Sequence, residues 1–241
     1  MEISLSSYLL NEFRKNKINV IFCDEKHNPS TQLLSLNGCF DSSRKVFKQI
    51  EWLNKNRIKV WKKVLYNKLY NQCDLLRIEG ISNTDLIEII KSSDLDDIEG
   101  IIAKMYFAKL FGKGFNRRVD NDINTMLNYG YSIIVSIINR SIVSLGYLTA
   151  IGIKHRNETN HYNFTYDAIE PFRPFVDKIV YENECSIFDN EIRRKLLEVV
   201  YSDCIYKNKK SKIIFVIPQY IKDLVDSIET GKNIIGRIEL V

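Results

Sequence analysis

Apolar residues recur every three to four positions through most of the chain, a period that is typical of amphipathic helices. Three of the predicted helices end at a glycine, Gly80, Gly112 or Gly146, where a helix C-cap favours that residue. The pattern predicts helices over residues 43–54, 57–78, 85–91, 96–111 and 122–145, and later ones near 167–181, 190–206 and 217–228. The fold class predicted is therefore mainly α.

One of these segments, residues 122–145, is apolar on more than one face. It carries Ile133, Ile134 and Val135 and, further along, Ile142 and Val143. A helix with apolar residues all round is buried, so we expect this helix to run through the centre of a helical bundle.

The first residues follow a different pattern. Residues 5–13 are expected to be helical, 18–22 to form a strand, 28–30 a turn and 31–36 a partner strand. Because two strands alone do not form a stable sheet, residues 1–38 are interpreted as the C-terminal remnant of an N-terminal β-domain. Residues 39–241 are then expected to form the α-helical domain.

Composition agrees with a globular protein. The chain has 241 residues, of which 45% are hydrophobic, enough to bury a sizeable core. Its formal net charge of +5 permits a polyanionic partner without establishing one.

The positive charge is concentrated. Between Arg44 and Lys68 nine basic residues face one acid, Glu51, and aromatic residues are interleaved with them. A solvated helix face is one interpretation, and a surface that contacts DNA phosphates without reading the bases is the other. The residues expected to contact DNA are Arg44, Lys45, Lys48, Lys55, Arg57, Lys59, Lys62 and Lys63.

The five cysteines are scattered and never form a CxxC motif, so neither a disulfide framework nor a zinc site is predicted. A reducing cytoplasm suits such a chain. No signal peptide is recognisable, and the most apolar long run, residues 129–153, is interrupted by Asn139 and Arg140.

Candidate chemistry lies in two acidic patches and one loop. Asp96 and Glu99 precede an apolar helix, and Asp167 and Glu170 repeat their spacing, which is also the spacing of a helix capping box. His155 lies in a polar loop, where most histidines are only surface residues, and His27 and His161 compete with it. Together the carboxylates and the imidazole offer the mixed oxygen and nitrogen ligands that a hard divalent cation accepts.

Five ordered motifs resemble a known family. They are VIFCDEK at residues 20–26, EGIIAKMYF with LFG at 99–112, LNYGY at 127–131, GIKHRN at 152–157 and EPFRPFVDKIVYEN at 170–183. Over almost the whole chain they resemble the CRISPR adaptation integrase, in the form found in type II systems. Members of that family carry further residues upstream, so the resemblance implies that this chain begins within their N-terminal β-domain.

The resemblance implies a metal-dependent DNA endonuclease and integrase. Glu99, His155 and Glu170 would be the catalytic metal ligands for Mg²⁺ or Mn²⁺, and Asp167 would be an auxiliary acid. A fragment's 3′-hydroxyl would attack a phosphodiester of the repeat array. The implied partners are double-stranded DNA, a second copy of the chain and a dimer of a small ferredoxin-like protein, in the cytoplasm.

Two alternatives stay open at this point. A catalytically silent DNA-binding or assembly subunit would keep the basic surface, and a free-standing metal-dependent nuclease would use the same ligands with water as the attacking group.

Overall fold

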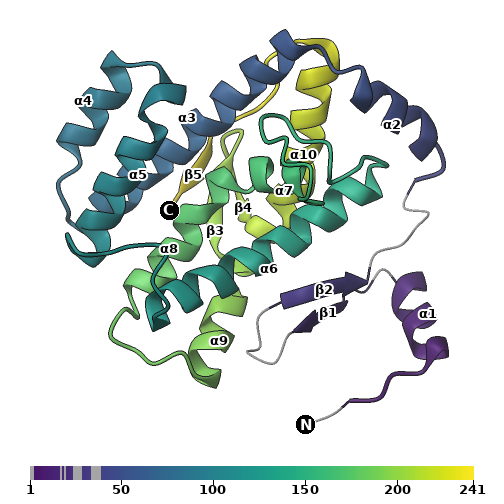
Figure 1. The fold of residues 1–241 in the computed structure, drawn as a ribbon, viewed down its shortest axis with the longest axis horizontal. Coiled ribbons are helices and arrows are strands. Elements are labelled where there is room, and N and C mark those ends of the chain that lie inside the picture. The colour runs from purple at the N-terminus through teal and green to yellow at the C-terminus, as the bar shows by residue number, and fades with distance from the viewer. Residues whose placement is uncertain (1–2, 17, 19, 24–28, 34–38) are drawn as a thin grey trace.

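The computed structural model describes residues 3–16, 18, 20–23, 29–33 and 39–241, and helices dominate these residues (Figure 1). The helices are α1 (Ser7–Lys15), α2 (Ser42–Ile50), α3 (Asn54–Ile78), α4 (Thr84–Ser92), α5 (Leu95–Phe111), α6 (Asp122–Ser144), α7 (Asn163–Ala168), α8 (Arg173–Tyr181), α9 (Asn190–Leu197) and α10 (Ile213–Thr230), with 3-10 turns η1 (Glu170–Phe172) and η2 (Glu198–Tyr201). The strands are β1 (Val20–Cys23), β2 (Pro29–Leu33), β3 (Asp203–Tyr206), β4 (Lys209–Lys212) and β5 (Ile238–Leu240). The prediction of a mainly α fold is confirmed.

Two long helices, α3 and α6, organise the core. Helix α3 packs against α5, η1, α10 and β5, and α6 packs against α7, α8, α9 and α10. Leu65, Leu69 and Leu76 of α3 and Ile134 and Ile138 of α6 are fully buried. The expectation that residues 122–145 form a central helix is confirmed, because apolar residues on several faces of α6 meet different neighbours.

Two late helices were predicted too long. Residues 167–181 are divided among the end of α7, η1 and α8, because Pro171 and Pro174 cannot donate the backbone hydrogen bonds of a continuous helix. Residues 190–206 also divide, with α9 giving way to η2 and then to β3.

The sheet that contains β3 was not predicted. Strand β3 lies between β4 and β5 in an antiparallel sheet, with Cys204 opposite both Ser211 and Leu240. Residues 207–212 form the hairpin turn and β4. These strands have three or four residues each, too few for a period of two to stand out.

The N-terminal strands pair as expected. Strands β1 and β2 are antiparallel, with Val20 opposite Leu33, and the Gln32 side-chain amide donates to the Ser136 carbonyl of α6 at 2.9 Å. Strand β2 begins at Pro29, where the sequence predicted a turn. Within the described residues, no helix has both the length and the apolar character needed to cross a membrane.

Candidate active site

Glu99 lies on the first turns of α5 and faces α3. The helix is capped by Asp94, whose side chain accepts from the Asp96 N–H at 3.2 Å. The N-cap is therefore Asp94, and Asp96 lies in the first turn, where it accepts the indole N–H of Trp61 at 2.8 Å. Glu99 is left free of capping, and its carboxylate contacts Lys68 of α3.

Glu170 begins η1, on the other side of Lys68. The Lys68 Nζ lies 2.6 Å from Glu99 Oε1 and 2.6 Å from Glu170 Oε2. The two carboxylate oxygens are thus no more than about 5.2 Å apart, twice the contact distance to the shared nitrogen. Two acids separated by seventy-one residues of sequence therefore converge on one point.

Opposite charges keep Glu170 ionised although it is buried. Burial raises the pKa of Glu170, but the attraction of Arg173 and Lys68 outweighs it and lowers that pKa to about 2. Burial lowers the pKa of Lys68, and its two carboxylate neighbours reverse that effect and raise it. Arg173 donates to Glu170 Oε1 at 2.8 Å, and its guanidinium lies 4.7 Å from the centre of the Tyr131 ring.

His155 is held by the buried carboxylate of Asp167 on α7. Its Nδ1 lies 2.5 Å from Asp167 Oδ1. A carboxylate only accepts hydrogen bonds, so the proton is assigned to Nδ1, and in the neutral imidazole Nε2 keeps its lone pair. The hydrogen bond to Asp167 raises the pKa of His155, against the effect of burial, and the charges of Glu170 and Glu99 raise it further. The charges of both carboxylates therefore favour the protonated form of His155.

Asp167 also fixes the backbone of the loop that carries His155. Its Oδ2 accepts the N–H groups of Ile153 at 2.5 Å and of Lys154 at 2.8 Å. Asp167 does not cap a helix, because both of its carboxylate oxygens accept hydrogen bonds from the loop that carries His155. An acid in this place orients the imidazole, as carboxylates behind metal-binding histidines do.

Arg57 of α3 holds the same loop from the other side. Its guanidinium donates to the carbonyls of Ile153 at 2.9 Å and of Gly152 at 2.7 Å. A Cβ at Gly152 would lie 2.7 Å from Asp167 Oδ2, so the approach of the loop to this carboxylate requires glycine.

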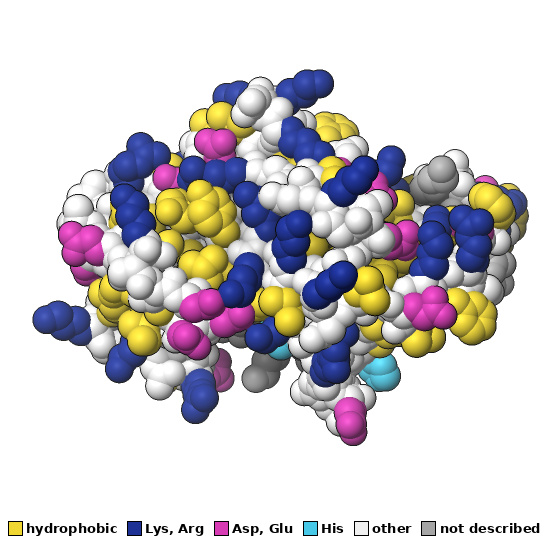
Figure 2. Space-filling view, turned by 90° about the horizontal axis from the view of Figure 1, so that it is seen from above, with side chains coloured by type: hydrophobic (Ala, Val, Ile, Leu, Met, Phe, Trp, Pro, Cys, Tyr) yellow, Lys and Arg dark blue, Asp and Glu magenta, His cyan; other side chains and the backbone are white. Residues whose placement is uncertain are grey.

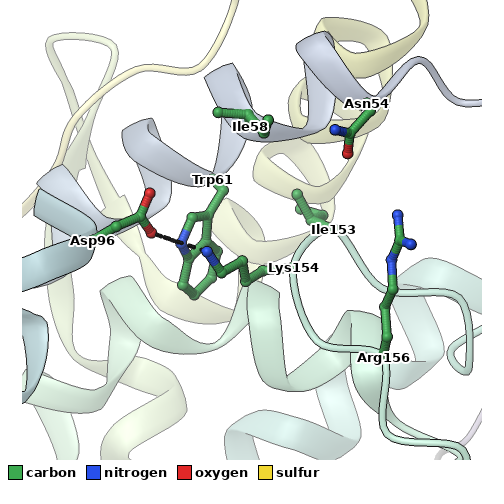
Figure 3. Close-up of a pocket in the computed structure, with 7 residues that line it drawn as sticks. All are labelled: Asn54, Ile58, Trp61, Asp96, Ile153, Lys154 and Arg156. Atoms are coloured by element: carbon green, nitrogen blue, oxygen red, sulfur yellow. Dashed lines mark hydrogen bonds and ion pairs between the residues drawn. The ribbon is translucent and has the colours of Figure 1, made fainter.

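A pocket of about 540 Å³ opens beside His155 (Figure 3). In Figure 3, Ile58 and Trp61 project from α3, while Lys154 and Arg156 come from the loop below. The Trp61 ring also meets the His155 ring edge-on, 5.9 Å between centres. Lys154 and Arg156 bring positive charge to a pocket with apolar walls, although Asp96, which also lines it, pairs with Lys154 at 3.3 Å. The positive charge that remains suits an anionic chain such as DNA.

Whether the donors fit a divalent cation can be judged from Glu170. Its Oε2 is buried, and among the described residues its one partner is the Lys68 ammonium, which meets it as an ion pair of poor hydrogen-bond direction. An oxygen in this state suits a cation that makes few directional demands. Carboxylate oxygens with an imidazole nitrogen are also ligands that Mg²⁺ and Mn²⁺ accept. Among the residues that the structure describes, no three acidic, histidine or cysteine side chains are yet gathered closely enough to hold an ion.

Of the two competing histidines, the structure describes only His161. His161 is exposed and uses its carbonyl to accept from the Thr149 hydroxyl at 2.8 Å. His27 lies outside the described residues.

The residues expected to contact DNA lie on α2 and α3, and several already have partners. Lys45 pairs with Asp41 at 3.1 Å, Lys48 with Glu229 at 3.2 Å and Lys62 with Asp94 at 2.7 Å. Lys59 donates to the Gly231 carbonyl at 3.0 Å, and Lys63 lies over the Tyr66 ring at 4.8 Å. Arg44 and Lys55 are exposed. Figure 2 shows Lys and Arg side chains spread over this face, with acidic ones between them.

Sequence reasoning missed Lys68 as a member of the site. It counted this residue with the basic segment, yet Lys68 is only 8% exposed. The available signal was its position, because Lys68 occupies the same helical stripe as the buried Leu65 and Gln72 of α3. A lysine on an apolar stripe requires a buried anion.

Comparison with known proteins identifies a family and a curated relative. The family described as CRISPR associated protein Cas1 matches residues 1–184. The CRISPR-associated endonuclease Cas1 of Neisseria meningitidis serogroup C (strain 8013) is 29% identical over 185 residues, which cover 74% of this chain and 60% of that protein. The chain thus spans less than two thirds of that relative.

Solved structures show the same fold. A casposase bound to integration product matches 95% of this chain and 76% of its own with a TM-score of 0.75 at 22% identity. A Cas6-RT-Cas1–Cas2 complex matches 95% of this chain and 30% of its own with a TM-score of 0.69 at 16% identity.

Proposed function

This chain belongs to the Cas1 family of CRISPR-associated proteins, and we propose that it joins DNA strands as the integrase and endonuclease of CRISPR adaptation. The observation that carries the proposal is the meeting of Glu99 and Glu170 on Lys68, together with the imidazole of His155, which Asp167 orients and whose pKa the charges of both carboxylates raise. A merely structural ion pair does not require the third, oriented group.

We propose a divalent metal at this point, Mg²⁺ or Mn²⁺, held by Glu99, His155 Nε2 and Glu170. When bound, such an ion polarises phosphoryl oxygens and lowers the pKa of an attacking hydroxyl. The protein supplies the charge and the geometry. Arg173 holds Glu170 Oε1 in place, and Asp167 keeps the His155 Nδ1 protonated so that Nε2 is available as a ligand.

The substrate we propose is double-stranded DNA, both as a fragment with a 3′-hydroxyl and as the repeat array that it enters. The pocket rimmed by Lys154 and Arg156 supports this substrate, because it brings a polyanion past His155. The casposase, a protein of the same fold, is bound to integration product, which supports the same reaction for this chain.

The proposed assembly is a homodimer bridged by a small ferredoxin-like partner dimer. It is supported by a structural relative that forms a complex with Cas2. The proposed domains are residues 1–38, which include the β1–β2 pair, and residues 39–241, the helical catalytic domain. A cytoplasmic location is proposed as well, since Cys39, Cys73, Cys185 and Cys204 are unpaired.

Strand-transfer assays test this function. A labelled fragment would be incubated with a repeat-containing target, the partner protein and Mg²⁺. Glu99→Gln and Glu170→Gln keep the side-chain size but remove the charge, and we expect at least about a hundredfold loss of product. Glu88→Gln, on the exposed face of α4, is the matched control and should retain activity.

A second fragment separates integration from hydrolysis. A fragment with a dideoxy 3′ end cannot attack, so an integrase gives no joined product with it. Cleavage of the target that continues unchanged with this fragment, and no joining with the normal one, would identify a free-standing nuclease instead. Full joining by Glu99→Gln and Glu170→Gln would remove the proposed centre altogether.

A further inference from the structure

The charges around Lys68 balance without any metal. Glu99 and Glu170 contribute two negative charges, and Lys68 and Arg173 contribute two positive ones. Lys68 is 8% exposed and lies between both carboxylates, so it occupies the place where their attraction for a cation is strongest.

The two contacts of Lys68 are unequal. Its bond to Glu99 Oε1 at 2.6 Å has the direction of a hydrogen bond. Its contact to Glu170 Oε2, also at 2.6 Å, is an ion pair of poorer direction, and that oxygen has no other partner among the described residues. Glu170 keeps its second oxygen on Arg173 regardless. The Lys68 ammonium can therefore leave Oε2 without releasing the Glu170 side chain.

A divalent cation and Lys68 cannot share this position. Mg²⁺ binds carboxylate oxygens at roughly 2.0–2.1 Å, closer than the ammonium does now. An ion bound to both oxygens would meet the Lys68 ammonium at contact distance, and the positive charges would repel each other in a poorly solvated place.

We propose that Lys68 is a built-in counter-cation, which holds Glu99 and Glu170 together in the absence of metal and must withdraw when a divalent cation binds. The inference rests on the proposed metal-dependent function. Its consequence is that the protein's affinity for metal is set below the value that the ligands alone would give, since each binding event must displace a resident positive charge.

Titration with Mn²⁺ tests the proposal, with free Mn²⁺ measured by electron paramagnetic resonance on the full chain. Lys68→Met removes the charge and keeps the length of the side chain. We expect this variant to bind Mn²⁺ at least about tenfold more tightly than the unaltered protein, and to gain more melting temperature from saturating Mn²⁺. Lys109→Met is the control. It breaks the 3.2 Å ion pair between Lys109 on α5 and Asp85 on α4, and should leave the Mn²⁺ affinity unchanged.

Equal or weaker Mn²⁺ binding by Lys68→Met would overturn the counter-cation role, while the metal-dependent function would stand as long as the unaltered protein binds Mn²⁺. Absence of Mn²⁺ binding in both proteins would overturn both proposals. Binding by Lys68→Met alone would support the counter-cation.

A crystal structure of the unaltered protein grown with Mn²⁺ gives a test that does not depend on the variant folding. Anomalous scattering would locate the ion. The expected result is an ion on Glu99 and Glu170 with Lys68 Nζ moved out of contact with Glu170 Oε2. An ion on both carboxylates with Lys68 still touching both would contradict the proposal. Lys68→Gln provides a second, polar variant for the titration.

Discussion

Position 152 carries the tightest steric requirement of the site. A Cβ there would lie 2.7 Å from Asp167 Oδ2 and 2.7 Å from the His155 carbonyl, and neither group is free to move. Gly152→Ala should destabilise the fold by about 1–3 kcal/mol and displace His155, with loss of strand transfer. Denaturant unfolding and the strand-transfer assay measure the two effects. Gly100→Ala, with open space around its Cβ, should instead stabilise α5 by about 0.5–1 kcal/mol. Similar unfolding curves for both variants would refute the steric argument.

Asp177 is a buried carboxylate in the core beneath the site. It accepts the hydroxyl of Tyr106 at 2.8 Å and that of Tyr131, and burial raises its pKa from 3.8 to about 6. A raised pKa in the folded state means that the protonated form is favoured. The stability contributed by Asp177 is therefore present below about pH 4 and is lost as the pH rises through 6.

Asp177→Asn removes this titration. From pH 4 to pH 7 the variant should gain on the unaltered protein in free energy of unfolding by on the order of 2 kcal/mol, whatever its offset at one pH. Urea unfolding across this range measures the difference. Parallel pH profiles of the two proteins would show that Asp177 titrates normally.

At the scale of elements, the long helices could be predicted from the sequence and the short ones could not. Helices α3, α5 and α6 run for several turns, so the apolar period identifies them. Strand β3, with only Cys204 and Tyr206 buried, offers no such run, and its partners β4 and β5 come from both sides of α10. The pairing of β3 with β5, across α10 in the sequence, is decided by tertiary packing rather than by local pattern, whereas β4 follows β3 directly after the turn at Lys207 and Asn208.

The residues of the candidate site also differ in whether a local sequence pattern predicts them. Glu99, His155 and Glu170 were predicted from motifs, since each stands in a run of residues that resembles one family. Lys68 and Arg57 act through contacts made across elements, Lys68 to two acids and Arg57 to two carbonyls. Such contacts follow from how α3 lies against η1 and the 152–155 loop, and no local sequence pattern states that.

Arg57 connects α3 to the loop that carries His155. It was expected to contact DNA, but its guanidinium holds the loop that Asp167 also fixes. Arg57→Ala should raise amide hydrogen exchange at Ile153 and Lys154 by at least about tenfold, because one side of the loop is released. Lys55→Ala, at an exposed position on the first turn of the same helix, should not change exchange there. Unchanged exchange in Arg57→Ala would show that Arg57 does not hold this loop, and the residue would again count only among the basic surface residues.

For the whole molecule, the basic segment on α2 and α3 is predicted to bind DNA phosphates without sequence preference. Replacing Arg44, Lys55 and Lys59 by glutamate should weaken binding to all duplexes alike and lower the slope of log affinity against log salt by about 0.9 for each phosphate that is no longer neutralised. Glutamates at the exposed Lys91, Lys104 and Lys113 change the net charge equally and are the control. Equal slopes for the two triple variants would leave the segment as a solvated surface.

The central claim is that Glu99, His155 and Glu170 hold one catalytic cation, and Mn²⁺ binding tests it most directly. Equilibrium titration should find one tight Mn²⁺ per chain, with affinity reduced at least about tenfold in each of Glu99→Gln, His155→Ala and Glu170→Gln. All three losses together place the ion among these side chains. Mn²⁺ bound with the same affinity and stoichiometry by the three variants would contradict the claim.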